Sequence, residues 1–303
     1  MPSLDDILNT DDFKNVAGIN DTTLILQRDG YDDVRLDENM DLIFLSLIPD
    51  PPTPQNNTSE AIPDMDGAYD VGGTTYGSRN LEAKFLLVCR DKYDLSLLKM
   101  DLMRLFDSKK PFNIIDEDRP GLKWYHLRLS DKITFEDNGS RVSVSTIPMI
   151  AYAPYAVSIG TSLTPLTADA DVWQVGQNIP TTVDPTYTHS EAEFSIWNLG
   201  DGQIDPRNVG DLYGMDLTIT FKGPSSGLTI ENLTNGDKWQ YTGTTSASDT
   251  ITLQGVFSKK NGASIFGDTN HGLTRLESGE NKIKISGTSG IFSITFDMPF
   301  LYL

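Results

Sequence analysis

The chain has 303 residues, of which 38% are hydrophobic and 22% are charged. This composition excludes a collagen-like or wholly disordered chain and is typical of a globular protein, and the length suggests two domains in preference to one large β domain. The net charge of −19 repels phosphate backbones, so nucleic acid is not an expected partner.

The charge is concentrated near the start, where residues 1–66 hold 15 acidic and 3 basic side chains. A signal peptide is basic and then apolar, and the start MPSLDDILNTDD is neither. The sequence has no run of about 18 apolar residues, as a membrane helix needs. We therefore expect synthesis in the cytosol and no membrane insertion. The single cysteine, Cys89, stands among alternating apolar residues and is expected to be buried.

The first elements are two strands followed by a long polar segment. Residues 22–29 and 41–49 are rich in β-branched and aliphatic residues and bounded by Asp, Asn, Gly or Pro. Residues 49–80 are dense in Pro, Gly, Asn and Ser, too long for a plain connection and too polar for a core element. We expect an arm or long loop there, before strand character resumes at 81–89.

One amphipathic helix is predicted at about 94–107. Its apolar residues recur at spacings of three and four: Leu95, Leu98, Leu102, Leu105 and Phe106. Asp94 is the expected N-cap, and the sequence Lys109-Lys110-Pro111 ends the helix.

Short strands fill the rest of the chain. They are predicted at 112–116, 123–130, 132–137 and 141–152, after which periodicity is lost and a domain boundary is placed near residue 157. The second half is predicted to consist almost wholly of strands and turns, and Asn235-Gly236 and Asn261-Gly262 are typical of β-hairpin turns. This pattern predicts an antiparallel sandwich or barrel.

No candidate catalytic or metal-binding residue lies in the sequence context that its chemistry requires. Ser225 matches the G-x-S-x-G pattern, but the next segment is a strand and not the helix that a nucleophile elbow requires. The three histidines, His126, His189 and His271, show no ligand spacing. Glu191 and Glu193 lie two apart on one strand, which is too common to indicate a glycosidase. We expect no enzyme activity, no catalytic residue, no cofactor and no metal.

Tryptophans give the one candidate for ligand contact. Trp197 and Trp239, with Trp173, are able to stack on a saccharide ring if their faces are exposed. Such aromatics in a β-sandwich are more often core or interface anchors, and no cluster of Trp with Asn, Arg and His marks one site. Trp197 and Trp239 are kept as candidate saccharide contacts.

The order of these elements resembles the distal tail protein family of long-tailed phages that infect Gram-positive bacteria. The closest likeness is in the second half, in 193–207, 217–223, 228–243 and 267–287. Asn232-Leu233-Thr234 stands there as in the family, and so does Leu276 followed by Gly279, Asn281, Ile283, Ile285 and Gly287. In the first half, 109–129 is similar to the family's passage from helix to strand, whereas 49–80 and the acidic start are less typical.

The resemblance implies a mainly β fold in two domains. Residues 1–156 would be a β-sandwich-like belt domain that forms rings, with one helix and the arm at about 49–80. Residues 157–303 would be a galectin-like antiparallel β-sandwich.

The resemblance also implies a role in the virion. The chain would form a hexameric ring hub at the distal end of the tail, assembled in the host cytoplasm, that joins the tail tube to the baseplate or host-recognition device. The implied partners are further copies of the chain, the tail tube protein, the tape measure protein, a tail-associated hub or lysin protein and a receptor-binding protein. The alternative function is a carbohydrate-binding module that attaches the virion to host cell-wall saccharide.

Overall fold

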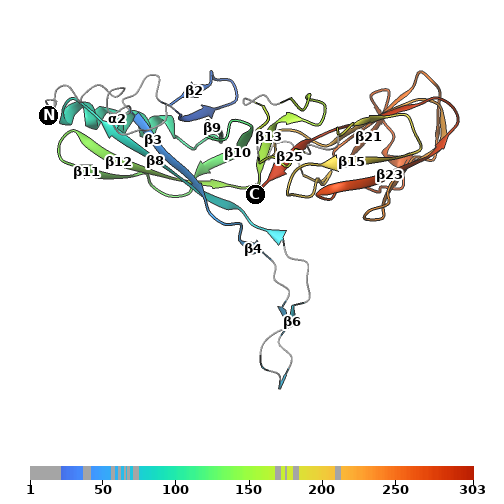
Figure 1. The fold of residues 1–303 in the computed structure, drawn as a ribbon, viewed down its shortest axis with the longest axis horizontal. Helices are drawn as coiled ribbons and strands as arrows, with labels where there is room; N and C mark the ends of the chain where they lie inside the picture. Colours follow the sequence, from blue (N-terminus) through green and yellow to red (C-terminus); the bar gives the residue numbers. More distant parts are fainter. Residues whose placement is uncertain are drawn as a thin grey trace. The chain divides into compact units, whose positions relative to one another are not determined.

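The computed structural model divides the chain into two compact units (Figure 1). One unit comprises Met1–Arg119 and Lys123–Pro154, and the other comprises Pro120–Leu122 and Tyr155–Leu303. The structure describes residues 22–36, 42–55, 59–60, 63–64, 66, 69–70, 75–167, 172–174, 176–179, 184–208 and 213–303. The acidic start at 1–12 lies outside the described residues, as do parts of the 49–80 segment.

The first unit is built on one antiparallel sheet. Its strands follow the order β2-β1-β9-β10-β12-β8-β3, and β11 pairs with β12. The bounds are β1 Leu24–Gln27, β2 Val34–Arg35, β3 Leu42–Pro49, β8 Arg79–Val88, β9 Phe112–Asp116, β10 Leu122–Leu129, β11 Thr134–Asn138 and β12 Val142–Ala151. The predicted strands of the first half are therefore confirmed.

The longest ladder of this sheet joins β8 to β12 over ten residue pairs, from Val142↔Val88 to Ala151↔Arg79. Burial alternates along both strands, as it must when one face of a sheet is covered. The covered face carries Ala83, Phe85 and Leu87, none of which is exposed to solvent. Cys89 follows β8 and is buried, as predicted.

The helix α2 spans Lys92–Leu105 and contacts β8. Its buried residues are Leu95, Leu98 and Leu102, from the predicted stripe. The predicted N-cap is wrong: the carboxylate of Asp91, not Asp94, accepts hydrogen bonds from the backbone N–H groups of Tyr93 at 2.7 Å and of Asp94 at 3.1 Å. The helix starts two residues earlier because Asp91 reaches these free donors of the first turn.

The polar segment at 49–80 continues the hairpin formed by β3 and β8. Pro49 pairs with Leu81 at the end of that ladder, and the Asp50 N–H donates to Asn80 O at 2.8 Å. The same register holds in the next pair of strands, β4 (Pro54–Gln55) with β7 (Thr75–Tyr76). It shifts by one residue at β5 (Ser59–Glu60) with β6 (Tyr69–Asp70). Antiparallel pairing that continues through β4–β7 and, after a shift of one residue, through β5–β6 favours a two-stranded extension over an irregular loop.

The second unit is a sandwich of two antiparallel sheets. The first sheet has the order β14-β24-β16-β20-β21-β22, with β14 Thr188–His189, β16 Thr218–Lys222, β20 Thr250–Gln254, β21 Phe257–Lys260, β22 Ala263–Ser264 and β24 Ser293–Asp297. The second has the order β15-β23-β17-β18, and β19 pairs with β17; the bounds are β15 Glu193–Asn198, β17 Ser225–Asn232, β18 Asp237–Gln240, β19 Thr244–Thr245 and β23 Gly279–Thr288. A further pair joins β13 (Ala156–Thr161) to β25 (Pro299–Tyr302), and one short 3-10 helix, η1, spans Phe266–Asp268.

The core of this unit lies between the two sheets. Alternate residues of β16 and β24 in one sheet, and of β17 and β23 in the other, form one buried cluster that includes Phe221, Phe296, Ile230 and Ile285. The predicted turns at Asn235-Gly236 and Asn261-Gly262 connect β17 to β18 and β21 to β22, and both glycines have positive φ. The predicted mainly β fold with antiparallel sheets is confirmed.

Candidate functional site

The two candidate tryptophans lie at opposite edges of the second sheet, on β15 and on β18. Trp239 pairs with Ile230, which faces the core, whereas Trp197 pairs with the exposed Glu280. Residues alternate between the faces of a sheet, so the two indoles stand on different faces. The structure does not bring Trp197 and Trp239 into one binding surface.

Trp239 is almost fully buried, with 2% of its surface exposed. Its indole N–H donates a hydrogen bond to Ser258 Oγ at 3.1 Å. Trp197 is half-buried and packs at the margin of the core, and its carbonyl accepts a bond from the Tyr187 hydroxyl at 2.8 Å. Trp173 is 1% exposed and donates to Pro165 O at 3.0 Å.

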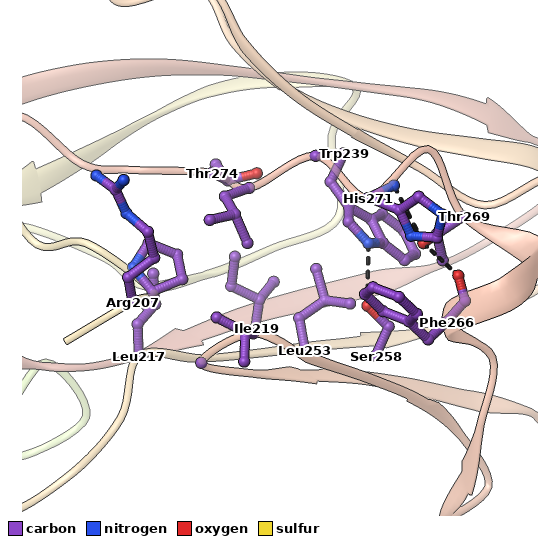
Figure 2. A pocket seen from close by; sticks show the side chains of 15 residues that line it. Arg207, Leu217, Ile219, Trp239, Leu253, Ser258, Phe266, Thr269, His271 and Thr274 are labelled. Carbon is purple, nitrogen blue, oxygen red and sulfur yellow. Dashed lines mark hydrogen bonds between the residues drawn. The ribbon is translucent and has the colours of Figure 1, made fainter. Parts of the chain in front are cut away.

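Trp239 nevertheless forms one wall of a pocket of about 260 Å³ within the sandwich (Figure 2). Ile219 and Leu253 of the six-stranded sheet, with Leu217 just before β16, lie opposite the segment that carries Thr274, and Arg207 stands at the far end from Trp239. Phe266 and His271 complete the end near Trp239, with ring centroids 4.3 Å apart. The lining is predominantly apolar.

The wall that carries Thr274 is an extended segment, 269–276, that runs beside β18. One end is fixed by the bridge Tyr241↔Thr269 and the other by the bridge Ile204↔Leu276. Between them, the Asn270 side chain accepts from Gln240 N at 2.9 Å and donates to Lys238 O at 3.0 Å. These bonds hold the segment in a defined position along the pocket.

Two ion pairs lie beside the pocket. Arg275 contacts Asp237 through Nε at 2.7 Å and Nη2 at 2.8 Å, and this guanidinium lowers the pKa of the Asp237 carboxyl. Arg207, which lines the far end of the pocket, makes the same two-point contact with Asp205. Both guanidinium groups are thus already neutralised, which disfavours a carboxylate or phosphate ligand.

The residues considered for chemistry have structural partners. Ser225 lies on β17, and its Oγ is 2.7 Å from Thr245 Oγ1. His189 stacks on Phe194 with ring centroids 4.1 Å apart, and the backbone N–H of His126 donates to Asn113 Oδ1 at 2.9 Å. Glu193 pairs with Lys284 at 2.9 Å. Within the described residues, no three His, Cys, Asp or Glu side chains gather closely enough to hold a metal ion.

The helix α2 presents a second apolar stripe to solvent. Tyr93, Leu97, Met100 and Met103 are exposed by between 43% and 69%. At 100° per residue they lie on the side opposite to Leu95, Leu98 and Leu102. Clustered apolar exposure of this kind is typical of interaction surfaces. The prediction of one apolar stripe missed it because the exposed residues have the same spacing of three and four.

None of the helices in the described part of the chain is long and apolar enough to cross a membrane.

Comparison with known proteins relates part of the first unit to a protein family. Residues 38–151 match the family of the phage tail protein RIFT-related domain. This segment, just over a third of the chain, is similar to a phage tail protein domain. No curated protein sequence matches the chain.

A solved structure extends the likeness in fold to most of the chain. The Dit protein (gp 19.1) of phage SPP1, described as a paradigm of the hub adsorption apparatus in phages that infect Gram-positive bacteria, is 14% identical. The match covers 92% of this chain and 100% of that one, with a TM-score of 0.62. Two baseplate structures of phage p2 in the activated conformation also match. The Ca form is 13% identical and covers 91% of this chain and 97% of that one with a TM-score of 0.33, and the Sr form is 13% identical and covers 92% and 98% with a TM-score of 0.34.

The resemblance to distal tail proteins is therefore confirmed at the level of fold. The closest likeness in sequence was expected from residue 190 onward, whereas the family match lies at 38–151, in the first unit.

Proposed function

We propose that the chain is a structural protein of a phage tail that forms a hexameric ring hub at the distal end of the tail. In this role it joins the tail tube to the baseplate or host-recognition device and acts without catalysis. The observation that carries the proposal is the fold shared with the SPP1 Dit protein over 92% of the chain, together with the phage tail domain at 38–151.

The proposal assigns a role to each part. Residues 1–156 act as the ring-forming belt, with the 49–80 segment as an arm, and residues 157–303 act as an outward galectin-like sandwich. The partners are other copies of the chain, the tail tube protein, the tape measure protein, a hub or lysin protein and a receptor-binding protein. The site of action is the virion, after assembly in the host cytoplasm.

Surfaces of the first unit support self-assembly. A ring arises when one patch meets a different patch on the next copy and the rotation closes. The outer stripe of α2 is one such patch, and the end strand β3, where Leu45 and Ile48 are 44% and 53% exposed, is another. An end strand also offers backbone groups that pair with a strand of a neighbour.

Stoichiometry tests the proposal. Light scattering of the purified chain should give a mass about six times 33.5 kDa, and negative-stain electron microscopy should show rings of that mass. A chain that stays monomeric at every concentration tested would contradict the ring.

The competing function predicts a different result. If the chain attaches virions to cell-wall saccharide, it should bind isolated cell walls of the host, and Trp197→Ala or Trp239→Ala should abolish the binding. Because the two indoles stand on different faces of the sheet, we expect neither variant to change cell-wall retention.

A further inference from the structure

The pocket beside Trp239 contains a polar group that the fold leaves unused. Thr274 is 2% exposed, and its Oγ1 has no hydrogen-bond partner among the described residues. A buried hydroxyl without a partner costs free energy that a bound ligand recovers. Two other hydroxyls that line the pocket have partners: Ser258 Oγ accepts from the Trp239 indole N–H at 3.1 Å, and the Thr269 hydroxyl donates to Phe266 O at 2.8 Å.

The walls specify the shape and polarity of the ligand. A cavity of about 150 Å³ with aliphatic walls holds a benzene ring, so a pocket of about 260 Å³ has room for a substituted ring. Leu217, Ile219 and Leu253 provide apolar contacts on one side, and Thr274 provides a single hydroxyl on the other (Figure 2). An aromatic ring with one hydroxyl group matches this arrangement.

A saccharide matches it less well. Sugars present hydroxyl groups around the whole ring and need several polar partners, whereas this lining is mostly apolar. The indole N–H of Trp239 already donates to Ser258 and is not free to bond a sugar hydroxyl.

The exposed rim of the pocket favours a protein side chain over a free small molecule as the aromatic ligand. Val256 and Phe266 line the pocket and yet are 43% and 51% exposed. A free phenol would leave this apolar rim in water, while a polypeptide that inserts one side chain covers the rim as well. Side chains that anchor protein interfaces typically fill such a pocket from the partner.

We propose that the pocket between Trp239, Leu253 and Thr274 receives a tyrosine side chain presented by another protein. The inference rests on the proposed role in tail assembly, because that role supplies protein partners. The tyrosine hydroxyl bonds to Thr274, and its ring packs on Leu217, Ile219 and Leu253.

The test uses the full chain labelled with 5-fluorotryptophan, which gives one ¹⁹F signal for each of the four tryptophans; Trp239→Phe identifies the Trp239 signal. The first probes are p-cresol, which is the tyrosine side chain, and toluene, which lacks the hydroxyl. We expect p-cresol to move the Trp239 signal, and Thr274→Val to weaken its binding about fivefold, the usual effect of one hydrogen bond. Thr274→Ser keeps the hydroxyl and should bind p-cresol as the wild type does. Toluene should bind both variants equally.

A further probe, a tripeptide, distinguishes a tyrosine of a partner protein from a free phenol as the ligand. The tripeptide acetyl-Gly-Tyr-Gly-amide should bind more tightly than p-cresol, and Val256→Ser should remove that advantage. If the tripeptide binds no better than p-cresol, the ligand is a free phenol and not a protein.

Three further results would overturn the proposal. The first is a Trp239 signal that does not move at about 10 mM p-cresol, a concentration that reveals even millimolar affinity. The second is an equal loss of p-cresol and toluene binding in Thr274→Val. The third is a Trp239 signal that responds to N-acetylglucosamine but not to p-cresol. Ring formation is measured separately by microscopy. If the chain forms hexameric rings but does not bind p-cresol, only the pocket proposal is contradicted. If the chain binds p-cresol but stays monomeric, only the proposed ring is contradicted.

Discussion

Trp239 and Ser258 connect the two sheets of the sandwich. The indole N–H of Trp239 on β18 donates to Ser258 Oγ on β21 at 3.1 Å, and both residues are buried. These strands belong to different sheets. A hydrogen bond between sheets is specific in direction, so it fixes their relative position more strictly than apolar packing does.

Ser258→Ala should therefore destabilise the second unit. The substitution leaves the Trp239 N–H buried without an acceptor, which costs about 1–3 kcal/mol of the free energy of unfolding. Urea unfolding followed by tryptophan fluorescence measures the loss. Ser289→Ala is the matched control, because Ser289 is exposed; equal stability of the two variants would show that the bond contributes nothing.

A second prediction concerns two buried asparagines, Asn232 on β17 and Asn281 on β23, neither of which is exposed. Asn232 Nδ2 donates to Asn281 Oδ1 at 3.0 Å, and Asn281 Nδ2 donates to Glu277 O at 2.8 Å. Asn281→Ala should lower the free energy of unfolding by about 3 kcal/mol, because it leaves more than one buried group without a partner. Chemical denaturation measures this, and Lys282→Ala, on the same strand but exposed, should leave stability unchanged.

These asparagines also show which features of the fold can be predicted from the sequence and which cannot. The resemblance drew attention to Asn232 and Asn281, but a polar residue in a strand is expected to face solvent. Only the pairing of β17 with β23 shows that both side chains face inward and satisfy each other. Strands and turns were predictable because alternation and Asn-Gly pairs are local signals.

The pocket was not predictable for a related reason. Its lining comes from Arg207, Ile219, Trp239, Leu253 and Thr274, which lie on separate elements along the chain. No local motif unites them. Trp239 was noticed as an aromatic residue, but the sequence around it does not tell which face of β18 it occupies; its register against Ile230 decides that.

The N-cap of α2 gives a sharp comparison between two aspartates. The carboxylate of Asp91 accepts two backbone N–H bonds, and these bonds lower its pKa. Asp91→Ala should lower the midpoint of thermal unfolding of the first unit, whereas Asp94→Ala should change it less. The contribution of Asp91 is present above its unfolded pKa and is lost as the pH falls through the lower folded value. Calorimetry of both variants at neutral and acidic pH measures this, and a larger effect of Asp94→Ala would restore the N-cap predicted from the sequence.

For Asp116, at the end of β9, we expect a pH dependence of stability that has the opposite sign. Burial raises the pKa of its carboxyl to about 6, against a bond from the Asp118 N–H that lowers it. Because the folded pKa is above the ordinary value of 3.8, the folded state binds the proton more tightly, and stability falls as the pH rises from about 4 to about 6. Asp116→Asn keeps the acceptor oxygen without the charge, so it should stabilise the first unit by about 1–3 kcal/mol at pH 7. Urea unfolding between pH 4 and pH 8 measures this; a variant with the wild-type pH profile would contradict it.

The outer stripe of α2 gives the most direct test of self-assembly. If this stripe lies between copies in the ring, Leu97→Asp or Met100→Asp places a charge in an apolar contact, and the chain should sediment as a smaller species. Ser289→Asp is the matched control, because Ser289 is exposed and lies in the second unit, away from the stripe. Analytical ultracentrifugation gives the mass of each variant, and circular dichroism confirms that each is folded. Wild-type mass in both Leu97→Asp and Met100→Asp would exclude α2 from the contact and leave the end strand β3, with Leu45 and Ile48, as the surface to be tested next.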